Sequence, residues 1–361
     1  MKRLIQILCI AIGVIFVAFC TVDKQHIEVK TDKKARVEVE EVILGRGVKD
    51  LKSFHDPSPE CDIQKNIDNE KSAEFKEGLS EWRAEDMENL QSALLWPKSQ
   101  EDIDKIGKVT SLKRLDISLI QEGKETNWNL AAISRLENLE ELNINGGNDE
   151  LDTQPLRELK NVKVLTLEGT DFDISFLSGM EALEELYTNR TGGIENLSMV
   201  TGLKNLKILD LYFVHEADLR LLKELEQLEE IEIASGDLYG FEGLENLSEI
   251  KRLKLQGSCL SDKTPYMDMG ILKNMKRLEE LTIGGIEIGD VDALTKLESL
   301  EWIVFVNTGI DDIESLCKMP NLKTLAIYGN KSKMVEKQGE AYQEMIRDLQ
   351  VSDDRPHDFD W

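Results

Sequence analysis

The segment LEELTIGGIEIGDVDALTKLES, residues 278–299, is followed directly by LEWIVFVNTGIDDIESLCKMPN, residues 300–321. The two segments have the same length and carry apolar residues at the same seven offsets. The first three of these positions follow the pattern LxxLxL, in which x is any residue. Seven matching offsets in consecutive segments predict a repeating structural unit.

The same pattern extends outward in both directions along the chain. Further copies are Leu112-Leu115-Ile117, Leu139-Leu142-Ile144, Val162-Leu165-Leu167, Leu183-Leu186-Thr188, Leu206-Leu209-Leu211, Leu228-Ile231-Ile233, Ile250-Leu253-Leu255 and Leu322-Leu325-Ile327, with a degenerate first copy at Leu90-Ala93-Leu95. One copy alone would also fit an amphipathic helix, but eleven copies in phase do not. We interpret LxL as a short strand with alternate side chains turned inward. Eleven such strands, stacked about 4.8 Å apart, predict a parallel sheet about 50 Å long.

This repeat resembles the leucine-rich-repeat family, and residues 307–313, NTGIDDI, look like the bacterial internalin type. The resemblance covers residues 87–330. It implies an α/β solenoid, a curved right-handed coil with a parallel sheet on the concave face and short turns or helices on the convex face. In that family an asparagine after the strand forms an internal ladder. The equivalent places here hold Thr170, Val214, Gly236, Ser258, Ile286, Thr308 and Asn330, so the ladder is largely absent.

The N-terminus predicts export from the cytoplasm. Lys2 and Arg3 precede an apolar run from Leu4 to Cys20, which has the pattern of a signal segment. Its length leaves a cleaved signal, a lipoprotein signal with Cys20 as the lipidated residue, and a retained anchor all open. We therefore expect an extracytoplasmic protein, secreted or anchored in the cell membrane, and the signal favours a bacterial source.

The repeats divide the chain into four parts. Residues 1–24 form the signal peptide or membrane anchor, 25–86 a spacer and N-terminal cap, 87–330 the repeat domain, and 331–361 a C-terminal capping helix with an acidic tail. Helical spacing of Phe75, Leu79 and Trp82 predicts a capping helix on the N-terminal side. The same spacing recurs on the C-terminal side at Val335, Tyr342, Met345, Ile346 and Leu349.

Composition excludes several function classes. A formal charge of -26 and a pI near 4.6 argue against nucleic acid and against anionic lipid, so membrane contact is expected only through the N-terminal segment or a lipid anchor. Beyond the signal, Cys61, Cys259 and Cys317 are widely spaced and indicate neither a disulfide framework nor a zinc site. The four histidines are scattered, and no catalytic motif or phosphate loop is present. We predict no enzyme activity, no cofactor and no metal.

Charges alternate at the second position of the repeat until the last three copies. This position holds Lys113, Glu140, Lys163, Glu184, Lys207, Glu229, Lys251, Glu279, Glu301 and Lys323. Because equivalent residues on adjacent strands stand about 4.8 Å apart, the pattern predicts ion pairs between neighbouring repeats. We interpret this row of charges as structural support.

Large side chains at outward positions of the strands point to recognition. These candidate binding residues of the concave face are Tyr187, Asn189, Tyr212, Trp302 and Tyr328, with Arg190 and Phe213 at strand ends. Exposed aromatic side chains commonly anchor recognition surfaces. We therefore expect the concave face to bind a protein or peptide. The alternative is a structural or self-associating spacer in the cell envelope that has no dedicated ligand.

Overall fold

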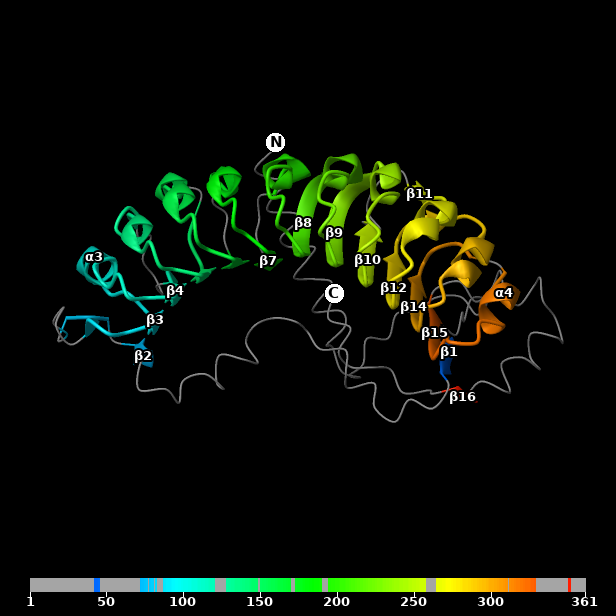
Figure 1. Ribbon diagram of the computed structural model, residues 1–361, viewed down its shortest axis with the longest axis horizontal. Helices are drawn as coiled ribbons and strands as arrows, with labels where there is room; N and C mark the ends of the chain where they lie inside the picture. The colour runs from blue at the N-terminus through cyan, green and yellow to red at the C-terminus, as the bar shows by residue number, and fades with distance from the viewer. Residues whose placement is uncertain are drawn as a thin grey trace, which may run out of the picture.

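The computed structural model describes residues 42–45, 72–328 and 350–351, except 77, 81, 83–86, 121–127, 149, 170–172, 190–193, 258–263 and 311. In these residues the strands line the inner side of an arc and short helical turns line its outer side (Figure 1). The predicted α/β solenoid with a parallel concave sheet is therefore confirmed.

Twelve parallel strands form the concave sheet in the order of the repeats. They are β2 (Ser72–Phe75), β3 (Ser92–Leu95), β4 (Arg114–Ser118), β5 (Glu141–Asn145), β6 (Val164–Glu168), β7 (Glu185–Asn189), β8 (Ile208–Asp218), β9 (Glu230–Tyr239), β10 (Arg252–Gly257), β12 (Glu280–Gly284), β14 (Trp302–Val306) and β15 (Thr324–Tyr328). Their register matches repeat to repeat, so that Leu253, Leu281 and Ile303 are paired in one row. A second sheet pairs β11 (Tyr266–Met267) with β13 (Glu287–Ile288). The concave sheet contains one strand more than the eleven predicted, because β2 adds a coil before the first copy of the motif.

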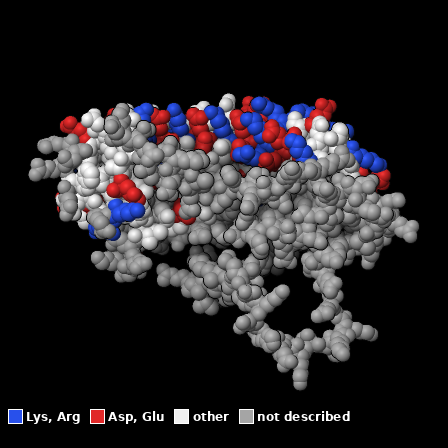
Figure 2. Space-filling view, turned by 90° about the horizontal axis from the view of Figure 1, so that it is seen from below, with Lys and Arg blue, Asp and Glu red and all other residues white. Residues whose placement is uncertain are grey.

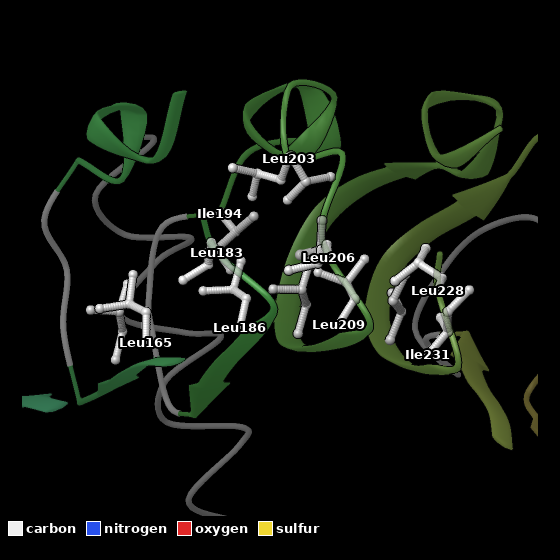
Figure 3. Close-up of a cluster of buried hydrophobic side chains, with 14 of the residues drawn as sticks. Leu165, Leu183, Leu186, Ile194, Leu203, Leu206, Leu209, Leu228 and Ile231 are labelled. Carbon is white, nitrogen blue, oxygen red and sulfur yellow. The ribbon is translucent and has the colours of Figure 1, made fainter. Parts of the chain in front are cut away.

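The core of the solenoid consists of continuous rows of aliphatic side chains. Leu183, Leu186, Leu206 and Leu209 are each 0% exposed and pack between neighbouring coils, as Figure 3 shows. Burying one such side chain contributes about 1.5–3 kcal/mol. Since each row is completed only by the adjacent coils, stability belongs to the stack and not to a single repeat.

Short helices return the chain along the outer side. Among the described residues, α3 (Gln100–Ile106) and α4 (Glu314–Cys317) are α-helices. The others are 3₁₀-helices: η3 (Ile133–Arg135), η4 (Gln154–Glu158), η5 (Ser175–Gly179), η6 (Leu197–Val200), η7 (Leu219–Leu222), η8 (Phe241–Leu244), η9 (Met269–Asn274) and η10 (Val291–Lys296). Because each coil is short, only one or two helical turns fit between consecutive strands.

An Asp or Asn side chain begins most of these turns. Its Oδ1 accepts a hydrogen bond of 2.8–3.1 Å from the backbone N–H two residues later, which supplies an acceptor for an amide at the start of the turn. The residues are Asn129, Asp152, Asp173, Asn196, Asp218, Asp268, Asp290 and Asp312. Before η8 the position is Gly240, whose backbone is left-handed at φ 72°. A Cβ there would lie 2.4 Å from Asp218 Oδ1, so glycine is required.

A partial asparagine ladder exists, but at another position of the repeat than the one expected from the family. Its members directly precede the first apolar residue of the LxxLxL motif. Each Nδ2 donates a hydrogen bond of 2.7–2.9 Å to a backbone carbonyl of the preceding repeat, and the four residues are Asn138, Asn161, Asn205 and Asn321. These bonds satisfy carbonyl groups in the turn that leads into the strand.

The N-terminal end of the sheet differs from the prediction. Residues Ser72–Phe75 form strand β2, paired in parallel with β3, so the capping helix predicted from Phe75, Leu79 and Trp82 is wrong. The apolar spacing of three and four residues arises instead from a strand and the turn after it, with Phe75 and Trp82 in an edge-to-face contact at 4.9 Å.

Asp102 on α3 is 3% exposed and binds the backbone of this first coil. Its carboxylate accepts the backbone N–H groups of Leu79 at 2.7 Å, Lys98 at 2.8 Å and Ser99 at 3.1 Å.

The C-terminal edge of the sheet is paired with a distant segment of the chain. Strand β1 (Val42–Gly45) runs antiparallel to β15, and β16 (Gln350–Val351) runs antiparallel to β1.

Several predicted features lie outside the described residues. They are Cys61, Cys259, the C-terminal helix and the apolar segment that ends at Cys20. Cys317 is described and is partly buried against the core. No helix in the described part of the chain is long and apolar enough to span a membrane.

The alternating charges at the second repeat position form the predicted ion pairs. Nζ–Oε distances are 3.1 Å for Lys113–Glu140, 3.5 Å for Lys163–Glu140, and 2.5 Å for Lys207–Glu184, Lys251–Glu229 and Lys323–Glu301. Basic and acidic side chains alternate along one long edge of the molecule in Figure 2. The predicted ion pairs between neighbouring repeats are therefore confirmed at these five places.

Replacing Asp102 with alanine should leave three backbone N–H groups without their acceptor. We expect a loss of about 3 kcal/mol in the free energy of unfolding, measured in urea, since unsatisfied buried donors cost about 1–3 kcal/mol each and part of the strain relaxes. Amide hydrogen exchange should accelerate first at Leu79, Lys98 and Ser99. Asp104, an exposed carboxylate on the same helix, is the matched control, and Asp104→Ala should change stability by less than about 0.5 kcal/mol. Equal effects of the two substitutions would contradict the assigned role of Asp102.

Reversing one charge in the row should lower the melting temperature. The Glu184 carboxylate raises the pKa of Lys207 by a direct hydrogen bond and by its charge. Lys207→Glu places like charges on adjacent strands, so the decrease should be larger at low salt than at high salt. Lys223→Glu, a reversal of an exposed lysine in the turn before β9, provides the comparison. An unchanged melting temperature for Lys207→Glu at low salt would refute the structural role.

Candidate binding face

The concave face is made of the side chains that alternate with the core residues along each strand. From β4 to β14 these positions carry eight acidic and three basic residues. The acidic residues are Asp116, Glu141, Glu168, Glu185, Asp210, Glu230, Glu232 and Glu280, and the basic ones are Arg114, Arg252 and Lys254. Because the rows lie about 4.8 Å apart along the sheet, the excess negative charge is concentrated on one surface.

Tyr187 and Tyr212 lie on adjacent strands, β7 and β8, and both are partly buried. The Tyr187 hydroxyl donates to Glu185 Oε2 at 2.9 Å, and the Tyr212 hydroxyl donates to Glu232 Oε1 on the next strand. Burial is the main cause that raises the pKa of Tyr187, and the charges of Glu185, Glu230 and Asp210 act in the same direction. Both rings are thus held in place by carboxylates.

Phe213 lies at a break in the strand pairing. The register between β8 and β9 shifts between Leu211 and Val214, and Phe213 occupies the bulge with a left-handed backbone at φ 61°. Its residue surface is 61% exposed, the largest value among the exposed large hydrophobic residues in the described part of the chain. A bulky residue rarely adopts this backbone conformation, and such strain is concentrated at functional sites.

The remaining candidates lie elsewhere along the sheet. Trp302 on β14 is partly buried, and Val304 beside it is 1% exposed although it is on the concave side of its strand. Three strands separate β8 from β14, which places Trp302 about 19 Å from Tyr212 along the sheet. The backbone of Tyr328 pairs with that of Val306 at the end of the parallel sheet. The predicted residues therefore form two groups.

Four of the seven candidates are close together on β7 and β8. Asn189 ends β7, where its carbonyl accepts the Gly169 N–H at 2.9 Å, near Tyr187, Tyr212 and Phe213. Arg190 lies outside the described residues. The prediction concentrated on aromatic side chains and missed the acidic residues between them. Their signal is present in the sequence, since the residue before the second apolar position of LxxLxL is glutamate in four copies, and the x inside LxL is acidic in three.

The described residues contain no group of three or more His, Cys, Asp or Glu side chains placed to hold a metal ion. Within the concave face the charged groups pair with each other instead. Arg252 contacts Glu230, and Lys254 Nζ lies 2.5 Å from Glu232 Oε1. This arrangement of acceptors, aromatic rings and fixed charges suits recognition of another molecule.

Glu280 predicts a measurable pH effect. It lies between Arg252 and Trp302 in the pairing register, and its residue surface is exposed. Partial desolvation of its carboxylate by the neighbouring side chains raises its pKa, Arg252 opposes this shift, and the charges of Glu230, Glu279 and Glu301 add to it. A raised carboxyl pKa means that the folded state loses stability as the pH rises above about 4.3, the usual value for an unfolded chain. Glu280→Gln should therefore raise the melting temperature at pH 7.

The stabilisation by Glu280→Gln should disappear near pH 4, where the glutamate becomes neutral. Glu298→Gln, at an exposed position in the turn before β14, is the charge-matched control. A stabilisation by Glu280→Gln that is equal at both pH values would show that its titration is not responsible.

Comparison with known proteins yields likeness in fold alone. No protein-family model matches the chain, and no curated protein sequence matches it. An internalin from Listeria monocytogenes is 20% identical, with 66% of this chain and 74% of that chain covered and a TM-score of 0.48. A leucine-rich-repeat protein from Leptospira interrogans is 16% identical over 66% of this chain and 78% of its own, with a TM-score of 0.35. A plant peptide hormone receptor is 13% identical over 66% and 47%, with a TM-score of 0.38.

The fold itself is decided by the chain's own geometry. Short coils each contribute one strand to a parallel concave sheet, and mostly 3₁₀-helical turns return the chain on the outer side. The chain is a leucine-rich-repeat solenoid of the short-repeat type.

Proposed function

We propose that this protein is an extracytoplasmic binding protein that recognises another protein or a peptide through its concave face. The observation that carries the proposal is Phe213, an aromatic residue that is 61% exposed on a left-handed backbone at a bulge. Exposing this ring gives no burial energy to the fold, and its backbone costs about 1–3 kcal/mol. A partner that covers the ring would recover the apolar energy.

The neighbouring side chains support this assignment. Tyr187 and Tyr212 are held by Glu185 and Glu232, so binding would cost little additional side-chain entropy. Trp302 would serve as a second contact farther along the sheet for a partner longer than about 19 Å. The extracytoplasmic location rests on the apolar N-terminal segment ending at Cys20, through which the protein would be secreted or tethered.

A photo-crosslinking amino acid at position 213 tests the binding face directly. On intact cells that carry the full-length chain, position 213 should form a covalent adduct with a second protein. Tyr266, which is 60% exposed on β11 outside the concave sheet, is the control site with matched exposure. Equal adducts at positions 213 and 266, or none at 213, would contradict the proposal.

Phe213→Gly separates binding from folding. Glycine relieves the left-handed backbone, so the variant should melt at the same or a higher temperature than the parent protein. Affinity for the crosslinked partner should fall at least tenfold, as expected when an aromatic anchor is removed. Retained affinity would exclude Phe213 from the interface.

A further inference from the structure

Within the described part of the chain, two neighbouring acceptor oxygens on the concave face are buried without a hydrogen-bond donor. They are Oδ1 of Asp116 on β4 and Oδ1 of Asn143 on β5. The two residues are direct partners in the strand register, so their side chains stand next to each other. Asp116 is 5% exposed, whereas Asn143 keeps part of its surface in solvent. A buried acceptor that lacks a donor costs about 1–3 kcal/mol, and the pair therefore has an unmet demand for N–H or O–H groups.

The surrounding charges determine which donor fits. Arg114 Nε lies 3.0 Å from Asp116 Oδ2, and Arg114 Nη1 lies 3.2 Å from Glu141 Oε2. One guanidinium thus faces two carboxylates, and this corner of the face stays negative. A neutral donor would leave that charge unbalanced, whereas a cation would balance it and supply the missing hydrogen bonds.

The same sign continues on β6 to β9, although Arg252 and Lys254 on β10 pair with Glu230 and Glu232. Beyond Arg114 the outward positions from β6 to β9 hold Glu168, Glu185, Asp210, Glu230 and Glu232 and no lysine or arginine. These five acidic residues occupy four consecutive strands, a span of about 14 Å between the first strand and the last. The electrostatic field therefore favours a partner with several positive charges in a row rather than a single cation.

We propose that the concave face binds a lysine-bearing segment of a protein, with one lysine ammonium seated between Asp116 Oδ1 and Asn143 Oδ1. This inference rests on the proposed function and specifies its partner. An ammonium group carries three N–H donors on a flexible stem, which matches two adjacent acceptors at the base of a curved surface. Further lysines of the segment lie over the acidic residues of β6–β9.

The probe for this site is a fluorescently labelled hexalysine peptide, with its fully ε-acetylated form as the neutral comparison. Binding is measured by fluorescence anisotropy with the full-length chain in a nonionic detergent at 0.15 M salt, where the screening length is about 8 Å. Hexalysine should bind and the acetylated peptide should not. Equal binding of the two peptides would overturn the proposal.

Substitutions at Asp116 and Asn143, compared with one elsewhere, distinguish a specific lysine site from attraction by the net negative charge. Asp116→Asn should weaken hexalysine binding at least tenfold, the loss expected for one charge-assisted hydrogen bond. Glu226→Gln removes the same charge at an exposed position before β9, about 19 Å or more from β5 along the sheet, and should change the affinity less than twofold. Equal weakening by Asp116→Asn and Glu226→Gln would show that net charge alone determines the affinity, and it would refute the proposed lysine site.

Asn143→Asp should change the hexalysine affinity in the opposite direction, and this distinguishes a loss of the site from misfolding. A second carboxylate beside Asp116 should strengthen hexalysine binding severalfold while lowering the melting temperature of the free protein. A folding defect cannot increase affinity, so failure of this variant to bind more tightly would also overturn the inference. Crosslinking at position 213 reports on the proposed function independently: adducts there without hexalysine binding would retain the binding face and reject its lysine specificity.

Discussion

Every coil of this protein depends on in-register stacking against its neighbours. The leucine and isoleucine rows are buried only because each strand is paired with the same offset to the next, as Leu253, Leu281 and Ile303 illustrate. A slip of one residue would turn each strand's apolar side chains to the concave face and its charges into the core. The ion pairs between second positions and the displaced asparagine ladder support the same register, because both connect one repeat to a fixed place in the neighbouring repeat.

The stacking leaves the outward positions of the strands free to serve another purpose. Core residues alternate with them along each strand, so their identity is not fixed by burial in the solenoid interior. They nonetheless share a bias toward carboxylates, and part of that charge destabilises the folded protein, as the raised pKa of Glu280 indicates. Phe213 adds an exposed ring on a strained backbone. Such locally unfavourable choices concentrate on the concave side, where a partner would compensate them.

Much of the architecture could be predicted from the sequence because its signal is local and periodic. The spacing of Leu278, Leu281 and Ile283 predicts strand, face and register together, and the alternating charges predict the lateral pairs. The N-terminal helix was a wrong prediction because Phe75, Leu79 and Trp82 fit a strand and turn as well as a helix. The pairing of β1 with β15 has no sequence signal, since it joins two segments with nearly the whole repeat array between them.

The candidate site could be predicted only in part for a related reason. Tyr187 and Tyr212 were identifiable as large outward residues. The carboxylate that holds Tyr212 comes from the next repeat, and the adjacency of Asp116 and Asn143, which also belong to consecutive repeats, requires the register to be known. Whether a side chain at an outward position is exposed, as Phe213 is, or buried, as Val304 is, depends on the curvature and covering of the face.

The position of β1 also sets an order of events during synthesis. This strand leaves the ribosome first among the elements described, yet its partner β15 is made only after the other strands of the parallel sheet. At a synthesis rate of about 5–20 residues per second, β1 waits on the order of tens of seconds for the edge that it pairs with. The coils from β2 onward can stack as they emerge, because each needs only the coil before it. Until β1 pairs with it, the edge of β15 is open to strands from other chains.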